Sequence, residues 1–146
     1  MTKEDKELLL KDLCGRLPYG VKCKVSYNSG VINDADATLY GIDKDGFLMF
    51  DEIGGDHREF LCKPYLFPLS SMTEKQKAEL ENLGWNFDNF EIHNVSECLG
   101  AYREYVAHLD CFELIDWLNK NHFDYRSLIP KGLAIDTTGL NIYKEE

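Results

Sequence analysis

No stretch of the sequence is apolar for long enough to cross a membrane. The longest apolar runs, near Leu8–Leu10 and Phe47–Phe50, have the length of a strand or of one helix face, whereas a spanning helix needs about 18 apolar residues. The first seven residues carry charges of both signs and lack the apolar core of an export signal. The sequence therefore predicts a soluble, cytoplasmic protein without a membrane partner.

Proline is scarce, and linker-like composition is missing. The chain has four prolines, no internal repeat and no stretch rich in Gly and Ser. A chain of 146 residues has the length of an ordinary domain and can bury a core without crosslinks. We expect one compact domain over residues 1–146, with a β-rich part over about 19–69 and a helical part over about 72–132.

The cysteine content does not fit a disulfide framework, which favours an even number of closely spaced cysteines. This chain has an odd number at wide, irregular intervals. We therefore expect reduced thiols, as in a reducing cytosol. The residues concerned are Cys14, Cys23, Cys62, Cys98 and Cys111.

Positive charge is sparse, above all in the second half of this acidic chain. The net charge is −10, and between Ala78 and Asp116 the only Lys or Arg is Arg103, against nine carboxylates. Affinity for nucleic acid comes mostly from contacts between cations and phosphates. The composition disfavours DNA and RNA as partners. It leaves open whether the acidic half only confers solubility or mimics nucleic acid.

The linear motifs of catalysis and cofactor binding are missing too. The sequence has no G-x-S-x-G elbow, phosphate-binding P-loop or G-x-G-x-x-G turn. His108 and Cys111 have the spacing of metal ligands, but no second pair completes a zinc site. Asp43–Gly46 has its glycine too early for a calcium loop. We expect neither a metal nor an organic cofactor, although an enzyme without a linear motif stays open as an alternative.

The sequence does contain clear signals for helices. Thr2 and Asp5 match a capping box ahead of an apolar stripe, and Gly15 and Pro18 mark the expected end of this helix. The apolar-polar alternation over 21–27 then predicts a strand.

Two further apolar segments, Thr38–Ile42 and Phe47–Phe50, flank Asp43–Gly46, which is typical of a hairpin turn. Arg58–Cys62 completes a set of four short strands. Their close spacing predicts a small, strongly curved antiparallel sheet, with an SH3-like sheet as the nearest analogy.

Helical signals return after this β-rich part. Pro64 and Pro68 are expected to interrupt any strand or helix. Thr73–Gln76 forms a second capping-box pattern, ahead of a helix that ends near Gly84. Apolar residues over Ser96–Leu109 follow helical spacing, and a further helix is expected before residue 119. The fold class is therefore α+β, with an N-terminal helix, a curved sheet and a helical C-terminal half.

Three blocks, Leu8–Val21, Lys63–Met72 and Asp116–Ala134, resemble an uncharacterised family of small proteins. The family is encoded by gut anaerobic bacteria and by their phages or mobile elements. It has no known activity. The resemblance therefore implies a cytoplasmic setting and no mechanism.

The third block contains the most distinctive polar cluster of the chain. It can be interpreted as a recognition surface with an aromatic anchor, a guanidinium and amides, or as helix ends and caps with a paired arginine. In the second case we expect Trp117 and Phe123 to be buried between the two halves. Tyr65, Phe67 and Pro68 are read as packing residues. The candidate interaction surface consists of Trp117, Asn121, His122, Asp124, Tyr125 and Arg126.

The sequence alone does not determine the function. It favours a non-catalytic protein-interaction module of mobile-element or phage origin. Two alternatives stay open: an acidic DNA mimic or anti-defence protein, and a small enzyme of unknown chemistry. A regular row of carboxylates would favour mimicry, whereas a deep pocket with convergent polar groups would favour catalysis.

The charge distribution predicts that duplex DNA does not bind near physiological salt, because the acidic second half repels phosphates. An electrophoretic mobility shift assay against a duplex of random sequence tests this. Salt-sensitive binding at micromolar concentration would contradict it and would reveal a cationic patch that the sequence does not show.

Overall fold

The computed structural model describes residues 2–26, 34–51, 53–57, 62–88, 91–94 and 113–143. Within these ranges no helix is long and apolar enough to cross a membrane. Residues 113–120 are helical. The other elements are α1 (Lys3–Arg16), η1 (Leu17–Tyr19), β1 (Lys22–Ser26), β2 (Asp34–Ile42), β3 (Leu48–Phe50), β4 (Ile53–His57), β5 (Cys62–Pro68), η3 (Leu69–Ser71), α2 (Glu74–Asn82), β6 (Trp85–Asp88), β7 (Glu91–Asn94), β8 (Phe123–Asp124) and β9 (Ile135–Asp136).

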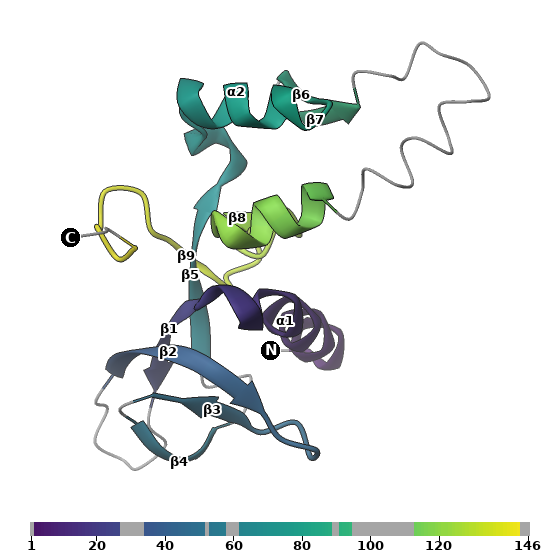
Figure 1. The fold of residues 1–146 in the computed structure, drawn as a ribbon. Coiled ribbons are helices and arrows are strands. Elements are labelled where there is room, and N and C mark those ends of the chain that lie inside the picture. Colours follow the sequence, from purple (N-terminus) through teal and green to yellow (C-terminus); the bar gives the residue numbers. More distant parts are fainter. Residues whose placement is uncertain are drawn as a thin grey trace.

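The predicted α+β class is confirmed (Figure 1). The main sheet has the strand order β4-β3-β2-β1-β5-β8, and β9 also pairs with β5. The pairings from β4 to β5 are all antiparallel, as expected. Strand β4 was not predicted, and the expected strand Arg58–Cys62 lies outside the described residues except for Cys62, which begins β5. The hairpin between β2 and β3 forms at the predicted turn, where Asp43 Oδ1 accepts hydrogen bonds from the amides of Asp45 and Phe47 and Gly46 adopts a φ of 85°.

Helix α1 begins at the predicted capping box but continues past its expected end. The Thr2 hydroxyl accepts from the Asp5 amide, and the Asp5 carboxylate accepts from the Thr2 amide. Gly15 lies inside the helix, where a Cβ atom would come within 3.4 Å of Asn119 Nδ2. A Cβ atom at this position would thus make ordinary van der Waals contact with Asn119. Gly20, with a φ of 68°, ends the segment after η1.

The expectation that Pro64 interrupts any strand is wrong. Strand β5 runs through it and contacts β1 on one side over Cys62–Pro64. On the other side its partners begin only at Tyr65, which pairs with β9. Pro64 thus lies where β5 has a single neighbouring strand, a position at which a missing amide proton is tolerated.

The C-terminal block contributes two short parallel strands that the sequence did not predict. Phe67 of β5 lies opposite Phe123 of β8, and Tyr65 of β5 lies opposite Ile135 of β9. The hairpin β6–β7 was also not predicted. Figure 1 shows β5 running from the sheet toward α2, with the C-terminal segment beside it. The expected helix over 96–109 lies outside the described residues.

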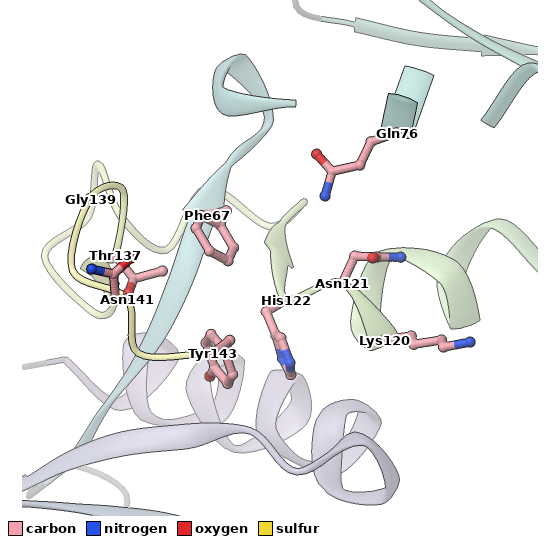
Figure 2. Close-up of a pocket in the computed structure, with 9 residues that line it drawn as sticks. All are labelled: Phe67, Gln76, Lys120, Asn121, His122, Thr137, Gly139, Asn141 and Tyr143. Atoms are coloured by element: carbon pink, nitrogen blue, oxygen red, sulfur yellow. The ribbon is translucent and has the colours of Figure 1, made fainter. Parts of the chain in front are cut away.

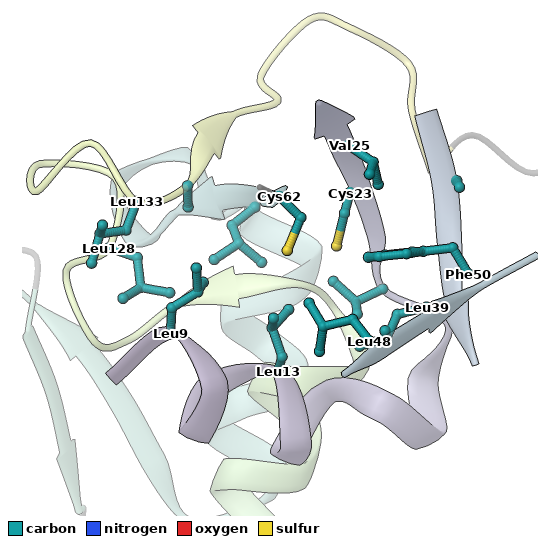
Figure 3. Packing of buried hydrophobic residues seen from close by; sticks show 14 residues of the cluster. Leu9, Leu13, Cys23, Val25, Leu39, Leu48, Phe50, Cys62, Leu128 and Leu133 are labelled. Atoms are coloured by element: carbon teal, nitrogen blue, oxygen red, sulfur yellow. The ribbon is translucent and has the colours of Figure 1, made fainter. Parts of the chain in front are cut away.

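Two groups of buried apolar side chains form the core. The first joins α1 and strands β1, β2, β3 and β5 to the segment 128–134, and the second lies between α2, the helix over 113–120 and β8. Figure 3 shows the sulfur atoms of Cys23 and Cys62 facing each other in the first group. Neither of these cysteines nor Cys14 forms a disulfide. Burial and the neighbouring Cys62 raise the pKa of the Cys23 thiol well above its usual value, which makes it an inert packing group.

The buried face of α1 also carries an ion pair. Leu9, Asp12, Leu13 and Arg16 are all fully buried, and their spacing places them on one face. Arg16 Nε donates to Asp12 Oδ2 at 2.7 Å, and Nη2 donates to Asp12 Oδ1 at 3.2 Å and to the carbonyl oxygen of Phe123 at 2.6 Å. The pair therefore fastens α1 to β8.

Three residues of the C-terminal block surround this pair. Arg126 Nε lies 3.3 Å from Asp12 Oδ1, an ion pair without hydrogen-bond alignment. Both guanidinium groups, of Arg16 and Arg126, lie over the ring of Tyr125, at 5.0 and 5.2 Å from its centroid. The Tyr125 hydroxyl donates to Asn119 Oδ1 at 2.8 Å. We call Asp12, Arg16, Asn119, Tyr125 and Arg126 the Asp12 network.

Replacing Arg16 by methionine should destabilise the fold strongly, because the buried Asp12 carboxylate loses its main partner. We expect a loss of about 3–5 kcal/mol in the free energy of unfolding, measured by urea melts. The double variant Asp12→Leu/Arg16→Met should recover part of that loss, since it removes both buried charges.

The control is Glu74→Gln, which removes the exposed partner of Lys77. It should cost less than about 1 kcal/mol. An equal loss in Arg16→Met and Glu74→Gln would contradict the structural role of the buried pair.

Candidate functional site

The structure divides the candidate interaction surface into residues with internal partners and residues that border hollows. Asp124 is buried, and its carboxylate oxygens accept hydrogen bonds from the Leu128 and Ile129 amides, each at 2.9 Å. Tyr125 and Arg126 belong to the Asp12 network. These three side chains therefore hold the fold together.

Trp117 and Phe123 form a stacked pair at the same place. Phe123 is 1% exposed and contacts Phe67 of β5, with ring centroids 6.2 Å apart. Trp117 is half-buried and stacks on Phe123, with centroids 5.6 Å apart and an angle of 19°. Phe123 is thus buried against β5 as expected, whereas Trp117 packs on Phe123 and keeps part of its ring accessible.

Asn121 and His122 border a cavity of about 440 Å³, which we call the corner pocket (Figure 2). Its size falls within the range of small-ligand sites. The lining comes from β5, α2, the corner after the helix over 113–120, and the C-terminal segment. The lining residues are Phe67, Gln76, Lys120, Asn121, His122, Thr137, Gly139, Asn141 and Tyr143.

Three walls of the corner pocket are hydrogen-bonded to consecutive residues of β5. The Phe67 amide donates to the His122 carbonyl oxygen at 2.8 Å, and the Thr137 amide donates to the Leu66 carbonyl oxygen at 2.9 Å. The Tyr143 hydroxyl donates to the Tyr65 carbonyl oxygen at 2.8 Å. The pocket is therefore built on a strand of the sheet, which fixes its shape.

His122 lies at the turn between the helix over 113–120 and β8. Its φ is 62°, a left-handed conformation that is costly for a residue other than glycine or asparagine. Its ring stacks on Tyr143, with centroids 3.6 Å apart and an angle of 11°. Burial, with the nearby cations Arg16 and Lys22, lowers the pKa of His122 from 6.5 to about 4. The imidazole is therefore neutral at neutral pH.

Two buried polar atoms of the corner pocket have no hydrogen-bond partner within the described part of the chain. They are Nδ1 of His122 and Oγ1 of Thr137, and Thr137 is 1% exposed. The Tyr143 hydroxyl, in contrast, also accepts from the Lys22 amide at 2.8 Å. Buried polar groups usually find a partner in the fold, so each of these two atoms keeps the capacity for one more hydrogen bond.

A second hollow, of about 410 Å³, adjoins the corner pocket. We call it the helix groove, because α2 forms one wall and the helix over 113–120, with the residue after it, forms the other. Lys120 and Asn121 line both hollows. The lining residues are Glu79, Asn82, Leu83, Trp117, Lys120 and Asn121.

Sequence reasoning missed most of the corner pocket. It assigned Phe67 to packing and Gln76 to a capping box, and it gave no role to Thr137 or Tyr143. These residues lie far apart along the chain, and the unpredicted parallel pairings of β5 bring several of them together. The capping box at Thr73 was the one local signal, because it places Gln76 at the start of α2.

Within the ranges that the structure describes, no group of three or more His, Cys, Asp or Glu side chains converges as metal ligands do. His108 and Cys111 lie outside these ranges, as do residues 89–90 and 95–112 of the acidic stretch between Ala78 and Asp116.

Comparison with protein-family models, with curated proteins and with solved structures found no match. The site is therefore interpreted from its own geometry.

The lowered pKa of His122 predicts a pH-dependent stability. Between about pH 6.5 and about pH 4 the unfolded chain binds a proton at His122 that the folded chain does not. The free energy of unfolding should therefore fall as the pH is lowered through this window, by about 2 kcal/mol for a partly solvated group. Urea melts at several pH values measure this decrease.

The control is His122→Asn, because asparagine tolerates a positive φ and does not titrate. As the pH falls through the same window, the free energy of unfolding of this variant should decrease less than that of the parent. The carboxylates titrate in both proteins, so their part of the decrease should be the same in both. Parallel pH profiles would contradict the lowered pKa.

Proposed function

We propose that this chain is a non-catalytic protein-interaction module, and that its partner docks along the helix groove and the corner pocket. One observation carries this proposal: the two hollows share Lys120 and Asn121 and so form one depression. Leu140, between two residues that line the corner pocket, is 52% exposed.

The chemistry of the helix groove suits a polypeptide. Trp117 presents part of its ring there and is fixed by stacking on Phe123. Rigid aromatic side chains in partly buried positions often carry most of the energy of an interface. Leu83 adds apolar surface, and Glu79, Asn82 and Asn121 add polar groups. This combination of an anchor with surrounding polar groups is common at protein interfaces.

The corner pocket favours binding over catalysis. A general acid or base works best when its pKa lies near the working pH, whereas the pKa of His122 is about 4. The lining of the pocket contains no Asp or Glu that could pair with His122. Among the described cysteines, Cys23 and Cys62 are buried in the core. An enzyme is therefore the weaker alternative, and acidic mimicry draws no support from the described residues.

We also propose a cytoplasmic location, which is supported by the absence of a disulfide at Cys14, Cys23 and Cys62, the described cysteines. The proposed origin in a phage or mobile element is supported only by the resemblance of the three sequence blocks.

Site-specific photocrosslinking in the native host tests the docking face. A photoreactive amino acid at position 120, on the rim common to both hollows, should give a discrete crosslinked species. The same amino acid at position 40 is the matched control, because Tyr40 is 62% exposed and lies on β2, outside both hollows. Adding Leu83→Glu to the position-120 protein should reduce the crosslinked species at least about tenfold.

Urea melts of each variant verify that the fold is kept. The same crosslinked species from position 40, or a yield from position 120 that Leu83→Glu leaves unchanged, would contradict the proposed docking face.

A further inference from the structure

We propose that the helix groove binds an amphipathic helix of a basic partner protein, an inference that rests on the proposed function. An apolar side chain of that helix would pack against Leu83 and Trp117, and a lysine or arginine beside it would face Glu79. The partner is thus defined by its chemistry, as a helix with one apolar face that is flanked by cations.

Each wall of the groove is one face of a helix. On both walls the three lining residues follow the spacing i, i+3, i+4, and side chains at this spacing lie on the same helix face. Two helix faces side by side leave a groove into which the side chains of a third helix can pack. The residues are Glu79, Asn82 and Leu83 on the α2 wall and Trp117, Lys120 and Asn121 on the other wall.

Backbone groups along the groove are already paired within the two helices. The Leu83 amide donates to the Leu80 carbonyl oxygen at 3.1 Å, and the Asn121 amide donates to the Trp117 carbonyl oxygen at 3.0 Å. None of the described residues that line the groove belongs to a strand, so an extended peptide finds no strand edge to pair with. A helix pairs its own backbone groups and binds through side chains alone. The walls therefore favour a helical ligand.

Trp117 and Leu83 supply the apolar surface for the partner. The Trp117 ring is half-buried and stacks on Phe123, with ring centroids 5.6 Å apart. Leu83 is also half-buried and packs against the second group of buried apolar residues. Both side chains are held by the core and keep part of their surface accessible. An apolar side chain of the partner can therefore cover them at little cost in conformational entropy.

Negative charge at the end of α2 favours a basic helix over an acidic one. The last turn of α2 has no basic residue, and the carbonyl groups of a helix C-terminus carry a partial negative charge. Glu79 is exposed in the groove and has no ion-pair partner within the described part of the chain. Glu113, also exposed, lies one turn before Trp117 on the same helix face. The net charge of −10 adds attraction for basic partners at longer range.

Lys120 places the opposite charge on the other wall. Among the described residues that line the groove it is the one cation, and Figure 2 shows its side chain extending away from His122 and Tyr143. A basic helix in the groove is attracted by Glu79 and repelled by Lys120. Removing these two charges should therefore change the affinity for such a helix in opposite directions.

Isothermal titration calorimetry of the full chain with matched peptides tests the inference. The first probe is a capped peptide of about 14 residues, with leucines spaced along one helix face and lysines elsewhere. The second has glutamate in place of every lysine, and the third is the basic peptide with proline in place of one central leucine. At about 0.15 M salt, which screens distant charges, the first peptide should bind at least about tenfold more tightly than either of the others.

Four charge variants locate the binding surface. Glu79→Gln should weaken binding of the basic peptide about threefold, and Lys120→Gln should strengthen it about twofold. The matched controls are Glu7→Gln and Lys11→Gln, which remove exposed charges on α1 outside the groove and should leave the affinity nearly unchanged. Leu83→Ala removes apolar surface without a change of charge and should weaken binding about fivefold. A urea melt of each variant verifies that it folds.

Equal affinity for the basic and the acidic peptide would overturn the inference, and so would equal effects of Glu79→Gln and Glu7→Gln. Tight binding of the proline-containing peptide would overturn the assignment to a helix. Host crosslinking from position 120 without a preference for the basic helix would leave the proposed function standing and refute the inference. A preference for the basic helix that depends on Glu79, without host crosslinking, would support the groove as a helix site and contradict the proposed partner.

Discussion

The ion pair between Asp12 and Arg16 is the interaction on which the arrangement of the remaining structure depends. Neither side chain has access to water, so each charge must be matched by partners inside the protein. Asp12 meets both arginines of the Asp12 network, and Arg16 also donates to the carbonyl oxygen of Phe123. These partners come from the two ends of the sequence. Separation of the first helix from the C-terminal block would therefore break the hydrogen bond from Arg16 to Phe123 and the ion pair of Asp12 with Arg126.

The same constraint positions the candidate site. The carbonyl oxygen of Phe123 accepts a hydrogen bond from Arg16, and the ring of Phe123 packs against Phe67. These two contacts fix the backbone that follows His122. Its backbone takes a positive φ there, and its ring stacks on Tyr143. The charge of Arg16 also helps to keep the imidazole neutral. One buried cation thus links the first helix to the C-terminal block and, after burial itself, contributes to the lowered pKa of His122.

The parts of the structure that could be predicted from the sequence are those with short-range causes. Local structure could be predicted where side chains bond to backbone groups a few residues away. This holds for the capping boxes at Thr2 and Thr73 and for the turn at Asp43–Gly46, where the residue types are enough to predict the conformation. Strand β5 could not be predicted, because its tolerance of Pro64 depends on where neighbouring strands begin. The ion pair was also hidden, since charges at positions 12 and 16 look like an ordinary solvated pair on a helix.

The corner pocket escaped prediction for a related reason, and that reason bears on its use. Its walls come from distant segments that attach to successive residues of β5, and successive residues of a strand are about 3.3 Å apart. Hydrogen bonds to Tyr65, Leu66 and Phe67 therefore hold the segments of Tyr143, Thr137 and His122 in place before any ligand arrives. Thr137 and His122 attach to opposite edges of β5, because the C=O of Leu66 and the N–H of Phe67 point in opposite directions. A pocket fixed in this way loses little conformational entropy on binding.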